Sequence, residues 1–326
     1  MIISKTPYRL SFFGGGTDYP IWFNKNKGAV LSATINKYIY ILLNSKSSLF
    51  HQDYRIVYRK TENKKKVQFI NHPSVRECFR YFDLKGGIEM NYMGDLPSQS
   101  GMGSSSAFTV GLLNSIYELK KIKINKKKLA LKAIEIEQQI IKENVGSQDQ
   151  ISASFGGFNL INFNRNNNFT VQQIEDNSDV LRKLNDNLLL FYTGIKRKAH
   201  DVANTYTHRL NSLNTNMNET YDLVSEGYTY LKEGNIDKFG KLLNTGWKLK
   251  KNLSKAVTNS KIDNLYETAI KEGALGGKLL GAGGGGFFLL YVPKNKIKRV
   301  ITSLKKLHFF KFKFENNGSQ IINSFN

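Results

Sequence analysis

Hydrophobic residues follow two spacings along the chain, and the change between them separates predicted strands from predicted helices. Up to Tyr92 the apolar positions are rich in β-branched and aromatic residues, and helical spacing dominates after the Gly/Ser-rich stretch at 97–107. The predicted strands are 2–13, 28–43, 54–58, 67–70, 88–92, 158–163, 169–174, 188–193, 287–292 and 309–314. The predicted helices are 105–119, 126–142, 236–250, 262–272 and 296–307, with further helical patterns over 199–230.

The polar stretch 175–179 is the best candidate for a domain boundary. Strands outnumber helices before it, and long helical patterns alternate with single strands after it. We therefore predict an α+β chain of two domains, residues 1–180 and 181–326.

Composition narrows the class of protein. The chain has 326 residues, of which 40% are hydrophobic, so it can build two modest cores. Its apolar runs are shorter than the about 18 residues that cross a bilayer, and Arg9 stands where a secretory signal would be apolar. Cys78 has no partner for an internal disulfide, which is consistent with a reducing compartment. The sequence thus predicts a cytoplasmic protein without membrane contact.

The net charge of +22 indicates anionic partners: nucleic acid, a membrane surface or phosphorylated metabolites. The basic residues are spread over the chain, and the densest run, 120–128, lies between two predicted helices, as a solvated connection would. No aromatic-rich RNA-binding signature, zinc pattern or regular basic stripe accompanies them. A specific nucleic-acid ligand is therefore not expected, although a basic nucleic-acid-binding protein stays open as the rival class.

Residues 97–107, PSQSGMGSSSA, stand directly before a predicted helix. Gly101 and Gly103 allow the backbone to approach a ligand closely, and a helix N-terminus offers unpaired N–H groups to an anion. A Ser-capped helix after an ordinary loop explains the same residues. On this stretch alone, both interpretations stay open.

Two further glycine clusters, 14–16 and 281–286, adjoin predicted strands, where backbone amides can face a ligand. The nearest match to a Walker phosphate loop, 273–278, has the wrong glycine spacing and is followed by Leu279 instead of Ser or Thr. A dinucleotide-binding signature within one βαβ unit is also missing. The glycines therefore fit neither of these two nucleotide-binding motifs.

Two acidic residues stand out around the second predicted helix. Glu137 has apolar residues three and four positions away on both sides, so it lies on an apolar face. A carboxylate there needs an ion-pair partner or a metal, and the pattern leaves both open. Asp149 lies in the predicted loop after the helix, where a turn or cap residue is the simple explanation.

Three motifs, in this order, resemble those of the GHMP kinases, the superfamily of galactokinase, homoserine kinase and mevalonate kinase. Residues 7–19 (PYRLSFFGGGTDY) resemble its N-terminal motif, residues 97–107 its Pro-x-x-x-Gly-Leu-Gly-Ser-Ser phosphate loop, and residues 279–287 (LLGAGGGGF) its third motif. The set spans nearly the whole chain. It implies a ribosomal protein S5 domain 2-like N-terminal domain and a ferredoxin-like C-terminal domain.

Within the superfamily the chain is most similar to the heptose 7-phosphate kinases, through Arg9, GGGTD at 14–18, the strand at 30–38 and NVGSQDQ at 144–150. Galactokinases carry an acidic residue and a histidine where this chain has two glycines, which argues against galactose. The resemblance implies a sugar-1-kinase that converts D-glycero-D-manno-heptose 7-phosphate into its 1,7-bisphosphate, for nucleotide-activated heptose and surface polysaccharide. Fucokinase domains share the glycine-rich Thr-Asp motif, so another sugar such as fucose stays open.

The resemblance also implies roles for single residues, with ATP and Mg²⁺ as cofactors. Asp149 corresponds to the catalytic aspartate, and Arg9 would orient it and offset charge on the transferred phosphoryl group. Ser105 corresponds to the metal-binding serine, and Glu137, twelve positions before Asp149, to the acidic Mg²⁺ ligand. The phosphates of ATP would bind Ser100, Gly101, Met102, Gly103, Ser104, Ser105 and Ser106.

For the acceptor sugar, Asp18 would hold hydroxyl groups, although Asp is also common in turns. Arg197, in the basic cluster 193–198, is the candidate for the distal phosphate, with a solvated helix start as the alternative. The expected partners are therefore ATP and a sugar phosphate, and a homodimer stays open. The full set of implied substrate residues is Gly15, Gly16, Thr17, Asp18, Arg197, Gly283 and Gly284.

Overall fold

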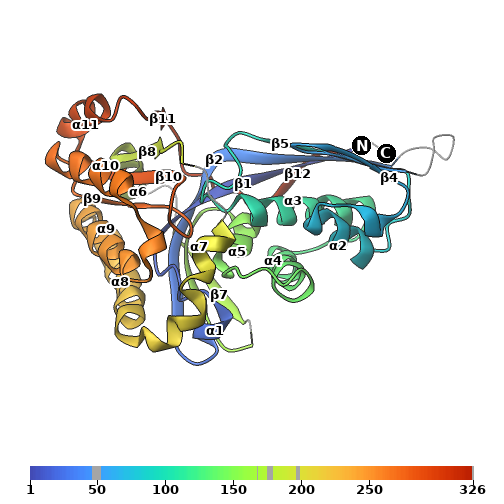
Figure 1. The fold of residues 1–326 in the computed structure, drawn as a ribbon, viewed down its shortest axis with the longest axis horizontal. Coiled ribbons are helices and arrows are strands. Elements are labelled where there is room, and N and C mark those ends of the chain that lie inside the picture. The colour runs from blue at the N-terminus through green and yellow to red at the C-terminus, as the bar shows by residue number, and fades with distance from the viewer. Residues whose placement is uncertain (46–52, 167, 175–178, 196–198, 325–326) are drawn as a thin grey trace.

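Two β-sheets with helices packed against them form the two halves of the molecule (Figure 1). The computed structural model describes residues 1–45, 53–166, 168–174, 179–195 and 199–324. The first sheet runs in the order β12-β1-β2-β5-β3-β4, with the hairpin β6–β7 attached to β2. Its strands are β1 (Ile2–Phe13), β2 (Gly28–Ser45), β3 (Tyr54–Val57), β4 (Thr61–Lys64), β5 (Ile88–Gly94), β6 (Phe158–Phe163), β7 (Phe169–Ile174) and β12 (Gln320–Ser324).

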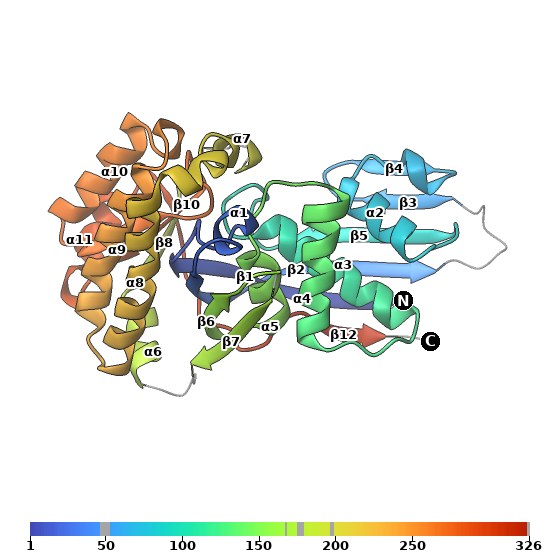
Figure 2. The same ribbon diagram turned by 90° about the horizontal axis from the view of Figure 1, so that it is seen from below.

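Helices of the first half lie below its sheet in Figure 1, and Figure 2 shows them from that side. The longest, α3, begins at Ser104 within the Gly/Ser stretch and packs against β1 and β2. The helical segments are α1 (Pro20–Phe23), the 3₁₀ turn η1 (Val67–Phe69), α2 (Pro73–Tyr81), α3 (Ser104–Leu119), α4 (Lys126–Ile134), the π-helical segment η2 (Glu135–Ile140) and α5 (Gln148–Phe155).

The second sheet is antiparallel, with the order β11-β8-β10-β9. Its strands are β8 (Leu188–Tyr192), β9 (Gly276–Leu279), β10 (Phe287–Tyr291) and β11 (His308–Phe310). The accompanying helices are α6 (Asp179–Asp186), α7 (Ala199–Asn204), α8 (Asn214–Lys232), α9 (Ile236–Lys251), α10 (Ser260–Lys271) and α11 (Ile297–Ser303), with 3₁₀ turns η3 (Thr207–Ser212), η4 (Lys255–Val257) and η5 (Lys294–Lys296). Helices α8 to α11 lie at the left of both views, and α7 lies nearer the first half. The predicted α+β organisation is confirmed.

Burial along β1 and β2 shows where the two halves meet. Residues 38–43 of β2 alternate between more and less buried positions, as in a strand with one covered face, whereas 28–35 are buried without interruption. On β1 the continuous burial is at the other end, from Thr6 to Phe13. Both strands pack against α5 of the first half and α8 of the second. These stretches therefore form the boundary between the halves, and β1 leads directly into the glycine turn 14–16.

Two expectations for local structure were wrong. Residues 67–70 were predicted as a strand, but Val67–Phe69 form a 3₁₀ turn that leads into α2, because Pro73 is well suited to the first position of a helix. The predicted loop around Asp149 is instead the first turn of α5. Short apolar runs do not distinguish strands from helical turns by spacing alone, which explains the first error.

The end of the chain returns to the first sheet. The predicted strand 309–314 is only three residues long, as β11, and beyond it Phe314 forms a bridge with Ile35 of β2. The final strand β12 then pairs with β1. The predicted boundary segment 175–179 lies, except for Asp179, outside the described residues. The chain passes from the first sheet, after β7, to the second sheet, at β8, on either side of this segment. However, β12 at the end of the predicted second domain belongs to the first sheet.

Phe12 connects the two halves and gives a stability prediction. Its fully buried ring stacks on Phe158, with 5.1 Å between ring centroids, and contacts Phe239 of α9 edge-on, with 5.4 Å between centroids. Phe12→Ala should therefore lower the free energy of unfolding by about 3–5 kcal/mol, measured by denaturant titration. Phe69→Ala, at a side chain that is 58% exposed, is the control and should change it by less than about 0.5 kcal/mol. Equal losses in both variants would contradict this account.

Candidate active site

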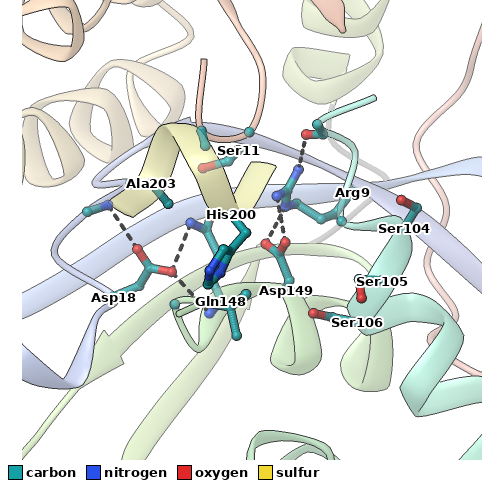
Figure 3. Close-up of a pocket in the computed structure, with 18 of the residues that line it drawn as sticks. Arg9, Ser11, Asp18, Ser104, Ser105, Ser106, Gln148, Asp149, His200 and Ala203 are labelled. Atoms are coloured by element: carbon teal, nitrogen blue, oxygen red, sulfur yellow. Dashed lines mark hydrogen bonds and ion pairs between the residues drawn. The ribbon is translucent and has the colours of Figure 1, made fainter. Parts of the chain in front are cut away.

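A cavity of about 410 Å³ lies between the two halves. The first half contributes the end of β1, the turn 14–16, the Gly/Ser stretch and the start of α5, and the second half contributes residues of α7, α8, α9 and the third glycine cluster. Figure 3 shows its centre, where most of the labelled polar side chains point toward one another. The cavity thus brings together segments from both ends of the chain.

Arg9 and Asp149 form a two-point ion pair at the centre of this cavity (Figure 3). Arg9 Nε donates to Asp149 Oδ1 at 2.6 Å, and Nη2 donates to Oδ2 at 2.7 Å. The third arm, Nη1, donates to the carbonyl oxygen of Gly101 at 2.8 Å. Arg9 is only 5% exposed, so this guanidinium fixes β1, α5 and the Gly/Ser stretch relative to one another.

Asp18 is a second, fully enclosed carboxylate on the same side of the cavity, with Gln148 between it and Asp149 (Figure 3). It accepts hydrogen bonds from the backbone N–H of Gly16 at 2.9 Å and from Gln148 Nε2 at 3.0 Å. A Cβ atom at Gly146 would lie 1.9 Å from Asp18 Oδ2, so only glycine fits there. Burial raises the pKa of Asp18, and the nearby Asp149 carboxylate adds to the shift.

The Gly/Ser stretch ends in a left-handed turn that starts α3. Gly101 and Gly103 have φ of +85° and +73°, and the side chains of Ser104, Ser105 and Ser106 follow at the helix N-terminus (Figure 3). All five residues line the cavity. The unpaired backbone N–H groups of the first helical turn therefore face a space large enough for an anion.

The third glycine cluster forms the opposite side of this stretch. A Cβ atom at Gly101 would lie 2.4 Å from the carbonyl oxygen of Leu280, and one at Gly286 would lie 2.2 Å from that of Ser100. The backbone N–H of Phe287 donates to the same Ser100 oxygen at 3.0 Å. The two glycine-rich segments therefore pack backbone against backbone, which side chains at these positions would prevent.

Not all predicted site residues reach the cavity. Gly15, Gly16 and Asp18 line it, whereas Thr17 donates through its hydroxyl to the carbonyls of Gly14 and Ala29. In the Gly/Ser stretch, Ser100 and Met102 are buried and do not line the cavity. In the third glycine cluster, Gly283 and Gly284 pack against Val257, and Gly281 and Ala282 line the cavity instead. Arg197 lies outside the described residues.

Glu137 is completely buried on the π-helical segment η2, a rare geometry that is frequent at functional sites. Ser106 Oγ donates to its Oε2 at 2.8 Å, and Gln150 Nε2 donates to the same atom at 2.5 Å. Burial, with a smaller contribution from Glu143, raises the pKa of Glu137 to about 7.

Glu137 lies behind the residues that line the cavity. Its second oxygen, Oε1, is buried and forms no regular hydrogen bond within the described part of the chain, although the Thr109 hydroxyl is near enough to lower the pKa of this carboxyl. A buried carboxylate oxygen without a partner fits a cation, and Ser105 offers a hydroxyl at the neighbouring cavity wall. Among the described residues, no three His, Cys, Asp or Glu side chains form a metal-binding group. The donors thus suit a cation such as Mg²⁺ that takes most of its ligands from phosphate and water.

The sequence did not single out several residues that line or support this site. Gln148 Nε2 donates a hydrogen bond to Asp18. Because Gln148 is adjacent in sequence to Asp149, the sequence could have indicated that it lies in the site. Lys278 lines the cavity from β9. In the sequence it ended the segment 273–278, whose glycine spacing did not match a Walker phosphate loop, so no role was expected for it. An aromatic group at one end of the cavity gave no sequence signal because separate elements supply it: Tyr58, His72, Tyr92 and Phe108.

Comparison with known proteins identifies the family. The model of the GHMP kinases N terminal domain matches residues 71–157, and the model of the GHMP kinases C terminal domain matches residues 228–308, together about half of the chain. The chain is 29% identical over 324 residues to a D-glycero-alpha-D-manno-heptose 7-phosphate kinase of Campylobacter jejuni, with 94% and 93% of the two chains covered. It is 27% identical over 355 residues to a galactokinase of Pyrococcus furiosus, covering 96% and 95%.

A crystal structure of a D-glycero-D-manno-heptose 1-phosphate kinase from Bacteroides thetaiotaomicron superimposes with a TM-score of 0.82 over 100% of both chains, at 22% identity. The protein belongs to the GHMP kinases and has their two-domain architecture. It is a sugar kinase, an ATP-dependent phosphotransferase with an alcohol group as acceptor. Within the described residues, no helix is both long and apolar enough to cross a membrane.

Gly146→Ala tests the position of Asp18. The new methyl group would occupy the space of Asp18 Oδ2, so the carboxylate must move and lose its present hydrogen bonds. We expect the KM for the acceptor sugar to rise by at least about tenfold, with the KM for ATP changed less than about twofold, in steady-state assays. An equal rise in both constants would show that the substitution disturbs the whole cavity instead.

Proposed function

We propose that this kinase phosphorylates the anomeric hydroxyl of D-glycero-D-manno-heptose 7-phosphate, giving the 1,7-bisphosphate. The observation that carries the proposal is the Arg9–Asp149 pair, which faces the cavity between Asp18 and the N-terminus of α3. The choice of heptose 7-phosphate is supported by the relative from C. jejuni, whose name states that acceptor.

In the proposed reaction the sugar hydroxyl at Asp149 attacks the γ-phosphorus of ATP. A bond forms between the sugar oxygen and phosphorus, the bond to the ADP oxygen breaks, and Asp149 accepts the hydroxyl proton. Arg9 keeps the carboxylate oriented and offsets negative charge that develops on the transferred group. Asp18 accepts hydrogen bonds from neighbouring sugar hydroxyls.

The Gly/Ser stretch would bind the phosphates of ATP through the N–H groups that begin α3. We assign the adenine base of ATP to the aromatic end of the cavity. There the His72 ring stacks on Phe108, with 4.6 Å between ring centroids, and meets Tyr58 edge-on, with 5.1 Å between centroids. Burial lowers the pKa of His72 to about 4, so its ring is neutral at pH 7. Its Nδ1 is buried and has no hydrogen-bond partner among the described residues.

Glu137 and Ser105 would hold Mg²⁺ together with phosphate oxygens and water, and the bound ion would offset charge on the phosphates. For the distal phosphate of the sugar, Lys250 joins Arg197 as a candidate because it lines the cavity from α9. A cytoplasmic location and a homodimer remain predictions.

Asp149→Asn tests the proposed base. The amide keeps the shape but cannot accept the proton, so we expect kcat to fall by about 10²- to 10⁴-fold while ATP still binds, measured by a coupled assay and calorimetry. Asp186→Asn, at an exposed position on α6, is the matched control and should keep full activity.

The acceptor is tested with heptose 7-phosphate, mannose, fucose and galactose in the same coupled assay. The highest kcat/KM is expected for heptose 7-phosphate. Turnover of fucose alone would transfer the assignment to the alternative sugar kinase. Absence of turnover with every sugar, with ATP binding retained, would contradict the heptose assignment and require an acceptor outside this panel.

Glu137→Gln tests the metal site independently. The amide removes the negative charge but keeps the hydrogen-bonding shape, so the Mg²⁺ concentration for half-maximal activity should rise at least about tenfold. Glu135→Gln, two residues earlier and bonded to Lys132, is the control and should leave the Mg²⁺ titration unchanged. Equal Mg²⁺ dependence in both variants would remove Glu137 from the metal site.

A further inference from the structure

Gln148 connects the two carboxylates at the acceptor end of the cavity. It is the first residue of α5, directly before Asp149, and it lies between Asp149 and Asp18 (Figure 3). It lines the cavity and is only 8% exposed. Its Nε2 donates to Asp18 Oδ2 at 3.0 Å, and its backbone N–H donates to the same oxygen at 3.3 Å. One residue thus bonds one oxygen of Asp18 twice.

The two carboxylates are held by different kinds of donor. Asp149 is fixed by two N–H donors of the Arg9 guanidinium. Asp18 instead accepts hydrogen bonds from three uncharged N–H groups: the backbone of Gly16, the backbone of Gln148 and the Gln148 amide. Two of these three are backbone groups, which remain when a side chain is exchanged. The Gln148 amide is therefore the member of this set that a side-chain substitution removes.

The orientation of the Gln148 amide follows from its partner. An ionised carboxylate only accepts hydrogen bonds, so the NH₂ end of the amide faces Asp18. The carbonyl end, Oε1, is buried and has no hydrogen-bond partner among the described residues. A buried acceptor without a partner is unfavourable for stability, and an apolar side chain of the same length would avoid that cost. The bond to Asp18 is thus the interaction that accounts for a glutamine at this position.

The segment before α5 also fixes the backbone of Asp18. The N–H of Ser147 donates to the carbonyl oxygen of Asp18 at 2.9 Å, and the missing side chain of Gly146 leaves room for the carboxylate. These contacts place the residue but not the plane of its carboxylate, because the terminal torsion of an aspartate has only a broad preference. The hydrogen bonds from Gly16 and Gln148 therefore decide in which direction the other lone pairs of Asp18 point.

We propose that Gln148 is a positioning residue for the acceptor sugar: its amide fixes the plane of the Asp18 carboxylate, so that this carboxylate meets the sugar hydroxyls in one geometry. The inference rests on the proposed function, in which Asp18 contacts the sugar. Gln148 acts through Asp18 and takes no part in the transfer of the phosphoryl group, because Arg9 holds Asp149 independently.

The first test compares the kinetic constants of Gln148→Met, which keeps the length of the side chain and removes the donor. The KM for heptose 7-phosphate should rise at least about tenfold, because the Asp18 carboxylate can then rotate out of the geometry that the sugar needs. The kcat and the KM for ATP should each change less than about threefold, because Arg9 still holds Asp149. An unchanged KM for the sugar, or a fall in kcat as large as the rise in that KM, would overturn the proposal.

Gln138→Met is the matched control for this comparison. Gln138 Nε2 donates to the carbonyl oxygen of Val145 and to the Ser147 hydroxyl, both at 3.0 Å. It therefore supports the same segment before α5, but through atoms other than those of Asp18. Its substitution should raise the KM for the sugar by less than about threefold. A rise equal to that in Gln148→Met would assign the effect to the segment as a whole and overturn the proposal.

The second test uses Gln148→Glu, which keeps the shape of the side chain but can donate only when its new carboxyl is protonated. At pH 8 the KM for the sugar should exceed that of the parent at least about fiftyfold, because two carboxylates then face each other. Lowering the pH to 6 should reduce this KM at least about fivefold, since the two carboxyls then share one proton and a hydrogen bond replaces the repulsion. A merely structural role would give no such recovery at the lower pH.

The parent and Gln148→Met are measured over the same pH range as references. Other titratable and charged groups also act on Asp18 or on its neighbours: Asp149 of α5, Lys278 of β9, the Tyr19 phenol and Arg9. All of them are present in each of the three proteins, so a recovery that occurs only in Gln148→Glu belongs to the new carboxyl. An equal fall of the KM in Gln148→Met, or no fall in Gln148→Glu, would overturn the proposal.

Folding and substrate identity have separate readouts. Gln148→Ala serves as a second variant without the donor if Gln148→Met unfolds, as measured by circular dichroism. Failure of both to fold would make Gln148 a structural residue and overturn the proposal. If the parent turns over another sugar of the panel instead, the heptose assignment fails, and the same constants measured with that sugar then test Gln148.

Discussion

The two-point ion pair between Arg9 and Asp149 is the interaction on which the rest of the active site depends. Its guanidinium is planar and nearly enclosed, and it bonds both carboxylate oxygens of Asp149 and the carbonyl of Gly101. One side chain therefore fixes a strand, a helix and a loop in a single geometry. Any acceptor hydroxyl placed at Asp149 is at the same time placed relative to the start of α3.

This arrangement requires the backbone to come unusually close at several points. Gly101 lies against Leu280, Gly146 against Asp18, and Gly286 against Ser100, and a Cβ atom at any of them would overlap its neighbour. The glycines around the site thus have two separate uses. Some leave N–H groups open to a ligand, and others allow the two halves to pack together around the cavity.

Local patterns were sufficient for most of the fold. The long strands β1 and β2, the hairpin β6–β7 and the helices α3 and α9 follow directly from their apolar spacing. The errors have different causes: spacing alone does not distinguish a short apolar strand from a helical turn, and packing between distant segments decides where the end of the chain pairs. Residues 67–70 form a turn because α2 begins at Pro73, and the segment that ends the chain leaves the second sheet to pair with β1.

The sequence by itself determined the family resemblance and singled out Arg9, Asp18, Glu137 and Asp149, because these residues lie in short motifs or interrupt an apolar face. It did not indicate that Ser106 bonds Glu137, that aromatic side chains gather around His72, or that Lys278 reaches Phe12. Each of these contacts joins segments far apart along the chain. Their geometry is decided only by tertiary packing, within the first half for Glu137 and His72 and between the two halves for Lys278, since no local spacing records which distant side chains will share one buried space.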